Sequence, residues 1–392
     1  MTEWKEYKLG DLIETNAKSI GRGYPYSKIL YLDTGSITCN KIESLQEFEL
    51  SEAPSRAKRL VSGDDIIYSS VRPDQLHYGF VQDPQDNLVV STGFVTITCN
   101  KTILYPKFLY YYLTQSQITE YLHSVAEAST SAYPSLRPSD IEALDIEIPP
   151  LKEQKRIAGV LSSLDDKIDL LHRENATLEQ MAETMFRQWF VEESKEEWEE
   201  VALEDVCERI TDGSHYSPES VEFGLPMASV KDMEDWGINL SSCRKISKEE
   251  FDKLVSADCL PQVNDILIAK DGSYLKHIFV VDKMQEVVIL SSIAIIRPNG
   301  IYHPYLLSIL LKLDSTKEEL KNIVTGAVIP RIVLKDFRKF PILLPPKEKQ
   351  EQALSFIEPI VKKCFYNREQ IQNLIQTRDG LLPRLMSGEI KI

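Results

Sequence analysis

The sequence lacks any long apolar run, and this absence excludes one class of protein. No stretch approaches the ~18 consecutive apolar residues that a membrane-spanning helix needs. The N-terminus, MTEWKEYKLG, also lacks the apolar core of a signal peptide. We therefore expect a soluble, cytoplasmic protein with no membrane partner. Its 392 residues are 43% hydrophobic, which is enough for two or three ordinary domains.

Metal-binding and disulfide patterns are absent as well. The cysteines form no C-x-x-C pair, and no two of the six histidines stand four residues apart on one helix face. We expect no metal site, and we expect the cysteines to be reduced thiols that lie mostly in hydrophobic cores. The six are Cys39, Cys99, Cys207, Cys243, Cys259 and Cys364.

The common catalytic motifs are missing too. The sequence contains no G-x-x-x-x-G-K-[ST], G-x-G-x-x-G, H-E-x-x-H or G-x-S-x-G motif. Its Pro-Pro pairs lack the Asn or Asp that an amino-methyltransferase motif requires, and no S-adenosylmethionine loop accompanies them. The chain is therefore predicted to be non-catalytic and to hold no cofactor of its own.

Positive charge is in short supply. The 45 Lys and Arg residues are outnumbered by 60 Asp and Glu, so the net charge is −15. Binding to nucleic acid is normally driven by Lys and Arg at the phosphates, and this balance argues against it. Any DNA site must be a local patch or must be completed by a basic partner.

What the sequence does contain is a duplication. The segment WKEYKLGDL at residues 4–12 returns as WEEVALEDV at residues 198–206. The segment IPPLKEQ at residues 148–154 likewise returns as LPPKEKQ at residues 344–350. The chain is therefore two diverged copies of one unit.

Each copy begins with short β-type runs separated by turn residues. An amphipathic helix then starts near Pro106 or Pro304, and a last short strand reaches the Pro-Pro pair. This pattern predicts a compact mixed α/β globule, present twice. The predicted strands are 28–32, 65–68, 78–81, 88–90 and 94–98 in the first copy, and 265–268, 278–281, 287–290 and 293–296 in the second.

Each copy ends in a heptad pattern. From about Leu151 to Phe190 the apolar spacing is that of a coiled-coil seam, over roughly 60 Å at 1.5 Å per residue, and the second copy repeats the frame. A helix with one apolar stripe needs a partner, and the other copy is the obvious one. The predicted seam residues are Ile157, Leu161, Leu164, Ile168, Leu171, Asn175, Leu178, Ile357, Ile360, Cys364, Asn367, Ile371 and Leu374.

We accordingly predict an α/β (mixed α+β) fold with two tandem globules and two long helices packed as an antiparallel coiled coil, a dumbbell with pseudo-two-fold symmetry. The expected domains are residues 1–150, 151–195, 196–346 and 347–392. The asparagines at seam positions, Asn175 and Asn367, have two interpretations. A buried amide can define the register of the helices, or these positions can lie in an exposed part of the seam.

Several motifs, in order along the duplicated chain, make it resemble the specificity subunit of type I restriction–modification enzymes. They are the W-x-x-x-x-L-x-[DE] start of each copy, the segments DTGSI (33–37) and TDGSH (211–215), the [IL]-P-P-x-x-x-Q start of each long helix, and the terminal LLPRLMSGE (381–389). The resemblance covers essentially the whole chain. The helix-start and terminal motifs are the most specific of the set.

The resemblance implies a function. In that family each globule is a target recognition domain that reads one half of a split double-stranded DNA target. Two methylation subunits dock on the helices, and restriction subunits join them. S-adenosylmethionine, ATP and Mg are then expected in the partner subunits and not in this chain. Partners that close around the DNA would also supply part of the phosphate contact, which accounts for the acidity of this chain.

DNA contact in each globule is expected from loop residues that carry donors and acceptors suited to base edges and phosphates. For any one of these residues, support of the globule is an equally open reading. The candidates are Ser70, Arg72, Gln75, His77, Tyr78, Ser129, Thr130 and Tyr133 in the first copy, and Ser214, His215, Lys270, Ser273, Lys276, His277, Thr325 and Arg331 in the second.

Two other functions stay open at the level of the sequence. The chain could be a coiled-coil scaffold that bridges two protein partners without binding DNA, which its acidity supports. A divergent nuclease or methyltransferase is the other alternative, and it would need activity from this chain alone. Neither the DNA target nor the existence of a restriction partner can be read from one sequence.

Overall fold

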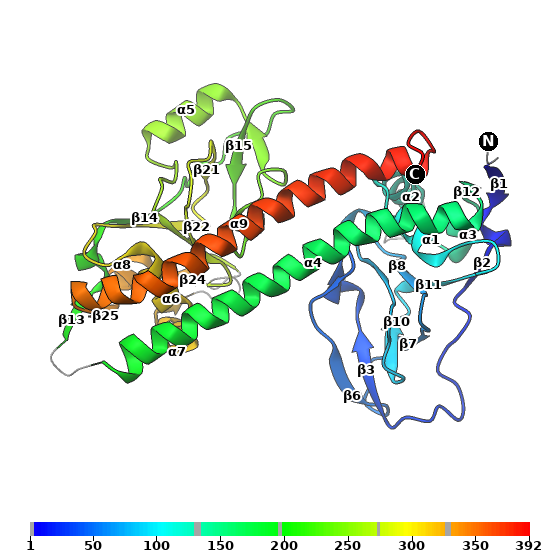
Figure 1. The fold of residues 1–392 in the computed structure, drawn as a ribbon, viewed down its shortest axis with the longest axis horizontal. Helices are drawn as coiled ribbons and strands as arrows, with labels where there is room; N and C mark the ends of the chain where they lie inside the picture. Colours follow the sequence, from blue (N-terminus) through cyan, green and yellow to red (C-terminus); the bar gives the residue numbers. More distant parts are fainter. Residues whose placement is uncertain (1–3, 129–134, 195–197, 273–274, 326–330) are drawn as a thin grey trace. The chain divides into compact units, whose positions relative to one another are not determined.

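The structure, a computed structural model, describes residues 4–128, 135–194, 198–272, 275–325 and 331–392. Its contacts divide the chain into two compact units, Met1–Ile168 with Leu374–Ile392, and Asp169–Asn373. The long helices α4 (Leu151–Arg187) and α9 (Lys347–Met386) contribute to both units. Each unit thus contains one globule and a segment of each helix, and the two are described separately (Figure 1).

The first globule is built on two four-stranded sheets. One is antiparallel in the order β2-β11-β8-β9, and the other has the order β6-β3-β10-β7 with a parallel β3–β10 pair. The strands are β1 (Lys5–Lys8), β2 (Ile13–Thr15), β3 (Lys28–Leu32), β4 (Ile37–Thr38), β5 (Lys41–Ile42), β6 (Gln46–Glu49), β7 (Ala57–Leu60), β8 (Ile66–Ser69), β9 (Tyr78–Phe80), β10 (Leu88–Ser91), β11 (Phe94–Cys99) and β12 (Asp145–Ile148). The helices are α1 (Pro106–Leu113), α2 (Ser116–Glu127) and α3 (Pro138–Glu142).

The second globule repeats this plan. Its antiparallel sheet has the order β14-β22-β19-β20, and its second sheet has the order β18-β15-β21 with a parallel β15–β21 pair. The strands are β13 (Glu199–Ala202), β14 (Cys207–Asp212), β15 (Leu225–Ala228), β16 (Met233–Glu234), β17 (Gly237–Ile238), β18 (Arg244–Ile246), β19 (Ile266–Ala269), β20 (Ile278–Val280), β21 (Val288–Ile289), β22 (Ile293–Pro298), β23 (Val324–Thr325), β24 (Arg331–Ile332) and β25 (Pro341–Leu344). The helices are α5 (Lys248–Ser256), α6 (Pro304–Lys312), α7 (Asp314–Leu320) and α8 (Leu334–Arg338).

All nine predicted strands are present within a residue or two, and α1 and α6 start at the predicted prolines. The first strand of each globule pairs with the strand that leads to its Pro-Pro pair, β1 with β12 and β13 with β25. The sequence pattern did not identify α2, α5 or α7. The copies also differ at the edge of the second sheet: where the first has the edge strand β7, the second has α5, which packs on β15 and β21.

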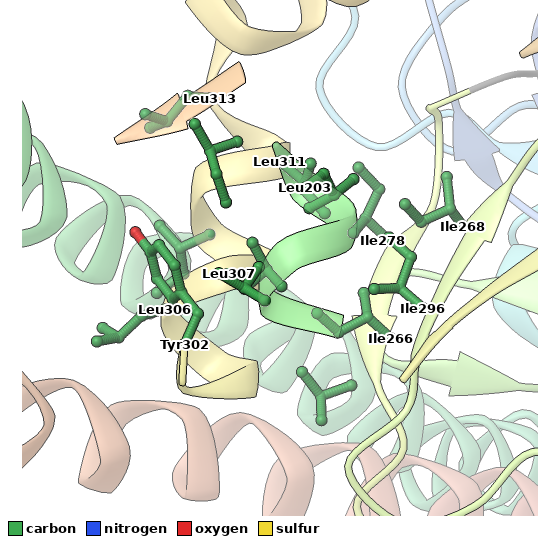
Figure 2. Close-up of a cluster of buried hydrophobic side chains, with 14 of the residues drawn as sticks. Leu203, Ile266, Ile268, Ile278, Ile296, Tyr302, Leu306, Leu307, Leu311 and Leu313 are labelled. Carbon is green, nitrogen blue, oxygen red and sulfur yellow. The ribbon is translucent and has the colours of Figure 1, made fainter. Parts of the chain in front are cut away.

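Buried apolar side chains fill the space between the antiparallel sheet and the adjoining helix in each globule. In the second, Ile266, Ile268, Ile278 and Ile296 from the sheet face Leu306, Leu307 and Leu311 of α6 (Figure 2). All seven side chains are buried because alternate strand positions and one helix stripe point into the same layer. No helix in the described part of the chain is long and apolar enough to cross a membrane.

The two long helices pack against each other in both units. In the second unit Asn175 of α4 meets Asn367, and Trp189, in the helical turn Gln188–Glu192 that continues α4, meets Phe356, so positions rise along the first helix as they fall along α9. The helices are therefore antiparallel there. All the predicted seam residues are buried or half-buried. In the first unit the pairing includes an ion pair, Arg378 Nη1 to Asp165 Oδ1 at 2.9 Å.

The seam asparagines form a polar layer within the second unit. Asn367 Nδ2 donates to Asn175 Oδ1 at 2.8 Å, and Asn175 Nδ2 donates to the carbonyl oxygen of Cys364 at 3.1 Å. Asn175 is 5% exposed and Asn367 is 0% exposed. The interpretation that places them in an exposed part of the seam is wrong. The hydrogen bond between the two amides forms in only one alignment of the helices, which is the property needed to specify register.

The glutamine of each P-P-x-x-x-Q motif joins a long helix to its globule. Gln154 Oε1 accepts from Tyr105 N at 2.8 Å, while its Nε2 donates to the carbonyl oxygens of Ile103 (2.9 Å) and Pro149 (2.8 Å). In the second unit Gln350 makes the same three bonds, to His303 N, Ile301 O and Pro345 O, each at 3.0 Å. Both side chains are almost fully buried, so each amide satisfies backbone groups that water does not reach.

Replacing the buried amide by a carboxylate should destabilise its own unit. In Gln154→Glu the two donations to carbonyl oxygens become repulsions, and we expect a loss of about 3 kcal/mol at pH 7 in urea unfolding. Burial beside carbonyl oxygens raises the pKa of the new carboxyl above its unfolded value. The loss should therefore be smaller at pH 5, where the folded form holds a proton.

Gln352→Glu is the matched control, because Gln352 is exposed on α9 and the same charge there should change stability by less than about 0.5 kcal/mol. Gln350→Glu should reproduce the effect of Gln154→Glu in the second unit. Equal stability of Gln154→Glu and the control would show that the buried amide does not hold the helix to the globule.

Candidate nucleic-acid interface

The loop that follows the central strand of each antiparallel sheet has the same position in the two globules. The β8–β9 loop lies beside Ser135, through an isolated bridge between Val71 and Ser135 and a bond from Leu136 N to Ser70 O at 2.7 Å. The β19–β20 loop lies beside β24 in the same way, through a bridge between Asp271 and Arg331 and a bond from Ile332 N to Lys270 O at 3.1 Å. In each globule the fold thus brings together two segments, distant in sequence, that were each predicted to contribute DNA contacts.

The backbone of this loop is unusual at its tip. Arg72 has φ 48° and ψ 70°, in the left-handed region that costs an L residue about 1–2 kcal/mol. At the corresponding position of the second copy stands Gly272, with φ +70°, where a glycine adopts the conformation without a Cβ clash. The first copy therefore holds an exposed arginine in a strained turn, where a glycine would be more stable.

The structure leaves several candidate side chains accessible to a ligand. In the first globule Arg72 and Gln75 are exposed, while Ser70 and His77 are half-buried. In the second, His215, Lys276 and Arg331 are exposed. The His277 side chain is 13% exposed, and its Nδ1 lies 3.0 Å from Asp235 Oδ1. The exposed Arg and Lys candidates of both copies lie on or beside the equivalent loops.

Three candidates are buried instead, so direct contact with DNA is not expected of them. Tyr78 lies in the core, where its ring stacks on Tyr68 at 5.9 Å, and burial raises its pKa strongly. The Lys270 Nζ pairs with Asp212 Oδ2 at 2.5 Å, and only 8% of the lysine side chain is exposed. The Ser214 hydroxyl closes a turn by donating to the Tyr216 carbonyl oxygen at 2.7 Å. Their polar groups support the loops.

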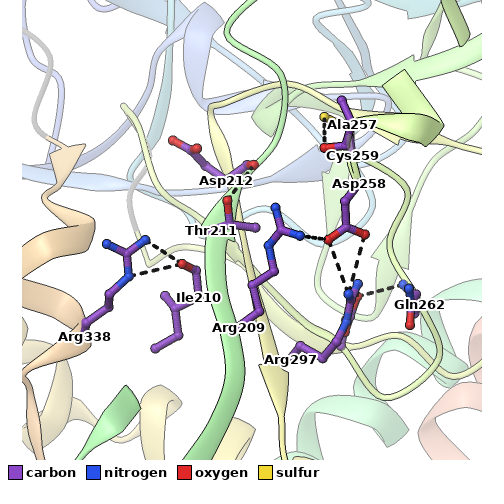
Figure 3. A network of polar contacts seen from close by, with 11 residues as sticks. Arg209, Ile210, Thr211, Asp212, Ala257, Asp258, Cys259, Gln262, Arg297 and Arg338 are labelled. Carbon is purple, nitrogen blue, oxygen red and sulfur yellow. Dashed lines mark hydrogen bonds and ion pairs between the residues drawn. The ribbon is translucent and has the colours of Figure 1, made fainter. Parts of the chain in front are cut away.

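The segment TDGSH is held by a polar network at the strand before it. Arg338 donates to the Ile210 carbonyl oxygen at 3.2 and 2.7 Å, and Arg209 pairs with Asp258 (Figure 3). At Gly213 an added Cβ would overlap the carbonyl oxygen of Ile289, so only glycine fits there. The network anchors β14, and the segment beyond it presents His215 at the surface.

The remaining candidates cannot be placed. Ser129, Thr130, Tyr133 and Ser273 lie outside the described residues, as does the side chain of Thr325. In the sequence, residues 129–134 directly precede the bridge residue Ser135, and residues 326–330 directly precede the bridge residue Arg331.

A cavity in each unit was not anticipated from the sequence. In the first unit it has a volume of about 660 Å³ and includes Tyr111, Asp165 and Arg378 in its wall. The Tyr111 hydroxyl donates to Asp165 Oδ2 at 2.6 Å, and burial, together with the charge of Asp165, raises the pKa of Tyr111. One cavity of the second unit has a volume of about 300 Å³, with Ile309, Val361 and Ala182 in its wall. No sequence signal pointed to these residues, because their neighbours come from segments far apart in the chain.

Residues 1–180 and 195–377 both match the family described as Type I restriction modification DNA specificity domain. These two matches cover most of the chain and correspond to the two copies. The chain belongs to this family.

Relatives of known description agree over the full length. The HindI specificity subunit of a type I restriction enzyme from Haemophilus influenzae is 26% identical, with 100% of both chains covered. The MjaIX specificity subunit from Methanocaldococcus jannaschii is 26% identical, with 100% of this chain and 89% of that chain covered. The crystal structure of the type I restriction–modification S subunit from M. genitalium has a TM-score of 0.51 at 17% identity, covering 98% of this chain and 96% of that chain.

Family membership confirms the predicted function as a DNA specificity subunit, which is not the catalytic part of a type I restriction–modification system. It also decides against the scaffold that does not bind DNA and against the divergent enzyme.

Within the described residues no group of three His, Cys, Asp or Glu side chains could hold a metal ion. Burial raises the pKa of the thiols of Cys99, Cys207, Cys243 and Cys364 to about 12, so these thiols are protonated at neutral pH.

The strained arginine of the first specificity domain allows stability and DNA binding to be separated. We expect Arg72→Gly to leave unfolding stability unchanged or to raise it by up to about 1 kcal/mol, because glycine relieves the left-handed strain. The same change should weaken binding of the cognate DNA by about 1–3 kcal/mol if the guanidinium contacts a base edge, and by less if it contacts a phosphate. Urea unfolding and a fluorescence anisotropy titration measure the two effects.

Lys101→Ala is the control, because Lys101 follows β11 at the end of the sheet opposite to the loop. Removing this cation lowers the charge of the domain equally but should leave binding within about 0.5 kcal/mol of the unmodified chain. Unchanged binding by Arg72→Gly would remove Arg72 from the interface.

Proposed function

We propose that each globule reads one half of a split double-stranded DNA target. The observation that carries this proposal is the difference between the copies at their shared loop. The two loops have the same place in equivalent sheets, yet the exposed Arg72 of the first corresponds to Gly272 of the second, and the exposed Lys276 of the second corresponds to Leu76 of the first. Two domains that recognise different DNA sequences need a common loop position with different side chains, because base edges are distinguished by their pattern of donors and acceptors.

We further infer that the chain works in the cytoplasm with methylation and restriction subunits. S-adenosylmethionine, ATP and Mg would then be bound by these partners. The net charge of −15 supports this division, since the acidic residues of the chain outnumber the cations that could contact phosphates. A basic partner that closes around the DNA would supply the remaining contacts.

Two methylation subunits per chain are favoured by exposed apolar residues on the helices. Leu170 of α4 is 48% exposed, and Tyr366 of α9 is 55% exposed. Leu170 and Tyr366 stand at corresponding positions of the two heptad copies. Large apolar side chains that are exposed at equivalent positions of a repeat suggest two equivalent docking faces for one kind of partner.

Exchange of one globule tests the two-reader proposal. A chain in which residues 1–150 are replaced by the equivalent part of a relative should methylate, with its methylation subunits, a target in which only one half has changed. The physical reason is that each globule has its own core and its own loop. The target is mapped as methylated adenines in the host genome before and after the exchange. A change in both halves, or in neither, would contradict the proposal.

Charge at the docking positions tests the number of partners. Leu170→Glu and Tyr366→Glu should each remove one of the two methylation subunits, because burying a carboxylate in an apolar contact weakens binding by at least about tenfold. The double variant should bind none. Light scattering of the purified complex gives the mass. Gln376→Glu, at an exposed polar position of α9, is the control and should keep both subunits. Loss of both subunits in either single variant would exclude two independent faces.

A further inference from the structure

A buried arginine joins α9 to two separate elements of the second globule. Arg368 is 7% exposed in the second unit. Its Nη1 donates to the carbonyl oxygen of Trp236, in the turn between β16 and β17, at 2.6 Å. Its Nη2 donates to both carboxylate oxygens of Asp282, just after β20, at 3.1 and 2.8 Å. One guanidinium therefore connects a long helix, a hairpin and the end of a sheet strand.

The surroundings are shaped to hold this guanidinium. The ring of Phe365, one helical turn earlier on α9, lies 5.5 Å from Arg368 Cζ, and the Trp236 ring meets that phenylalanine edge-on at 5.5 Å. Gly237 leaves the space that Nη1 occupies, because an added Cβ would lie 3.0 Å from it. The arginine therefore has a contact or a shaped space on each of the three elements, the helix, the hairpin and the strand end.

The first copy does not contain this arrangement. Alignment of the repeats places His172 at the position of Arg368, Gln82 at that of Asp282 and Lys41 at that of Gly237. All three members are changed, although the antiparallel sheets of the two globules have the same strand order. The contact is therefore not a requirement of the shared fold. It is a property of how the second globule is attached to α9.

A contact of this kind resists small rotations of the second globule relative to α9. The donor directions of a planar guanidinium are fixed, and its charge is shielded from water, so a tilted globule would leave a buried charge without its partner. The neighbouring pair Lys283–Glu369 lies close by but is exposed, with 49% and 43% of the two side chains accessible. Solvent can replace that pair when the globule moves, so it does not define an orientation.

We propose that Arg368 is a positioning residue that holds the second globule in one orientation on α9 and thereby makes the chain selective for the gap between its two half-sites. This inference rests on the proposed reading of a split target. One base pair added to the gap shifts a half-site by about 3.4 Å and rotates it by about 35° around the duplex. A fixed globule cannot follow that rotation, whereas a loosened one can.

The experiment measures binding of the complex with methylation subunits to duplexes that share both half-sites and differ only in the gap. The gap is the mapped one, one base pair shorter or one longer. For the unmodified chain we expect a strong preference for the mapped gap. Arg368→Gln should reduce the ratio between mapped and altered gaps by about tenfold or more. Discrimination against base changes within a half-site should stay as it was.

Three further variants keep the test independent of one substitution. Asp282→Asn and Gly237→Ala disturb the same contact from the two other elements, and we expect both to reduce the gap preference. Arg368→Lys keeps the charge but lacks the planar donors, and it should restore the preference only partly. Lys283→Gln, beside Asp282, is the matched control and should leave the ratio unchanged. If Arg368→Gln does not fold, the milder Asp282→Asn and Gly237→Ala carry the test.

Hydrogen exchange gives a readout that needs no DNA. Amides of residues 233–238, and of the segment around Asp282, should exchange faster in Arg368→Gln than in Lys283→Gln. A variant that binds DNA with the original gap preference would overturn the inference, whatever its effect on stability. If the unmodified complex binds no split target at all, the proposed function itself fails, and the exchange result alone then decides whether Arg368 restrains the globule.

Discussion

The attachment of each long helix to its globule depends on one buried primary amide. Gln154 and Gln350 each accept one backbone hydrogen bond and donate two, at a point where a chain turns from a Pro-Pro pair into the helix. Of the three backbone groups bonded in each unit, one is the carbonyl oxygen of the first proline of the pair, and the other two belong to the segment that leads into α1 or α6. The glutamine therefore joins the start of the long helix to a separate part of the globule. Without it, backbone groups would be buried and unsatisfied where the helix leaves the globule.

The two copies use this shared frame for different purposes. The strand order of the antiparallel sheet and the glutamine junction are the same in the two copies. The loop beyond the central strand is free to differ because its side chains lie at the surface, as Arg72 and Gly272 illustrate. The residue that contacts the second globule from α9 differs as well, since His172 stands in the first copy at the position of Arg368. A specificity subunit can thus change what it reads without changing how it folds.

Polar groups inside the helix pair also differ along its length. The second unit contains the amide pair Asn175–Asn367, and the first contains the ion pair Asp165–Arg378. At the position of that ion pair the second unit has only apolar residues, Val361 and Ala182. Each polar contact is satisfied in one alignment only, whereas apolar residues can slide past one another at lower cost. The helix pair therefore has specific contacts in both units.

By itself the sequence determined the duplication, the nine central strands, both long helices and their seam, because these depend on periodicity and on motifs that act locally. It also led to the family through the order of those motifs. Only the tertiary structure decided which candidates are accessible: Tyr78 and Lys270 are buried, whereas Arg72 and Lys276 are exposed. It alone revealed the bonds of Gln154 and the contact of Arg368 with Trp236 and Asp282. Burial and pairing of this kind join residues distant in sequence, and no local pattern encodes such a meeting.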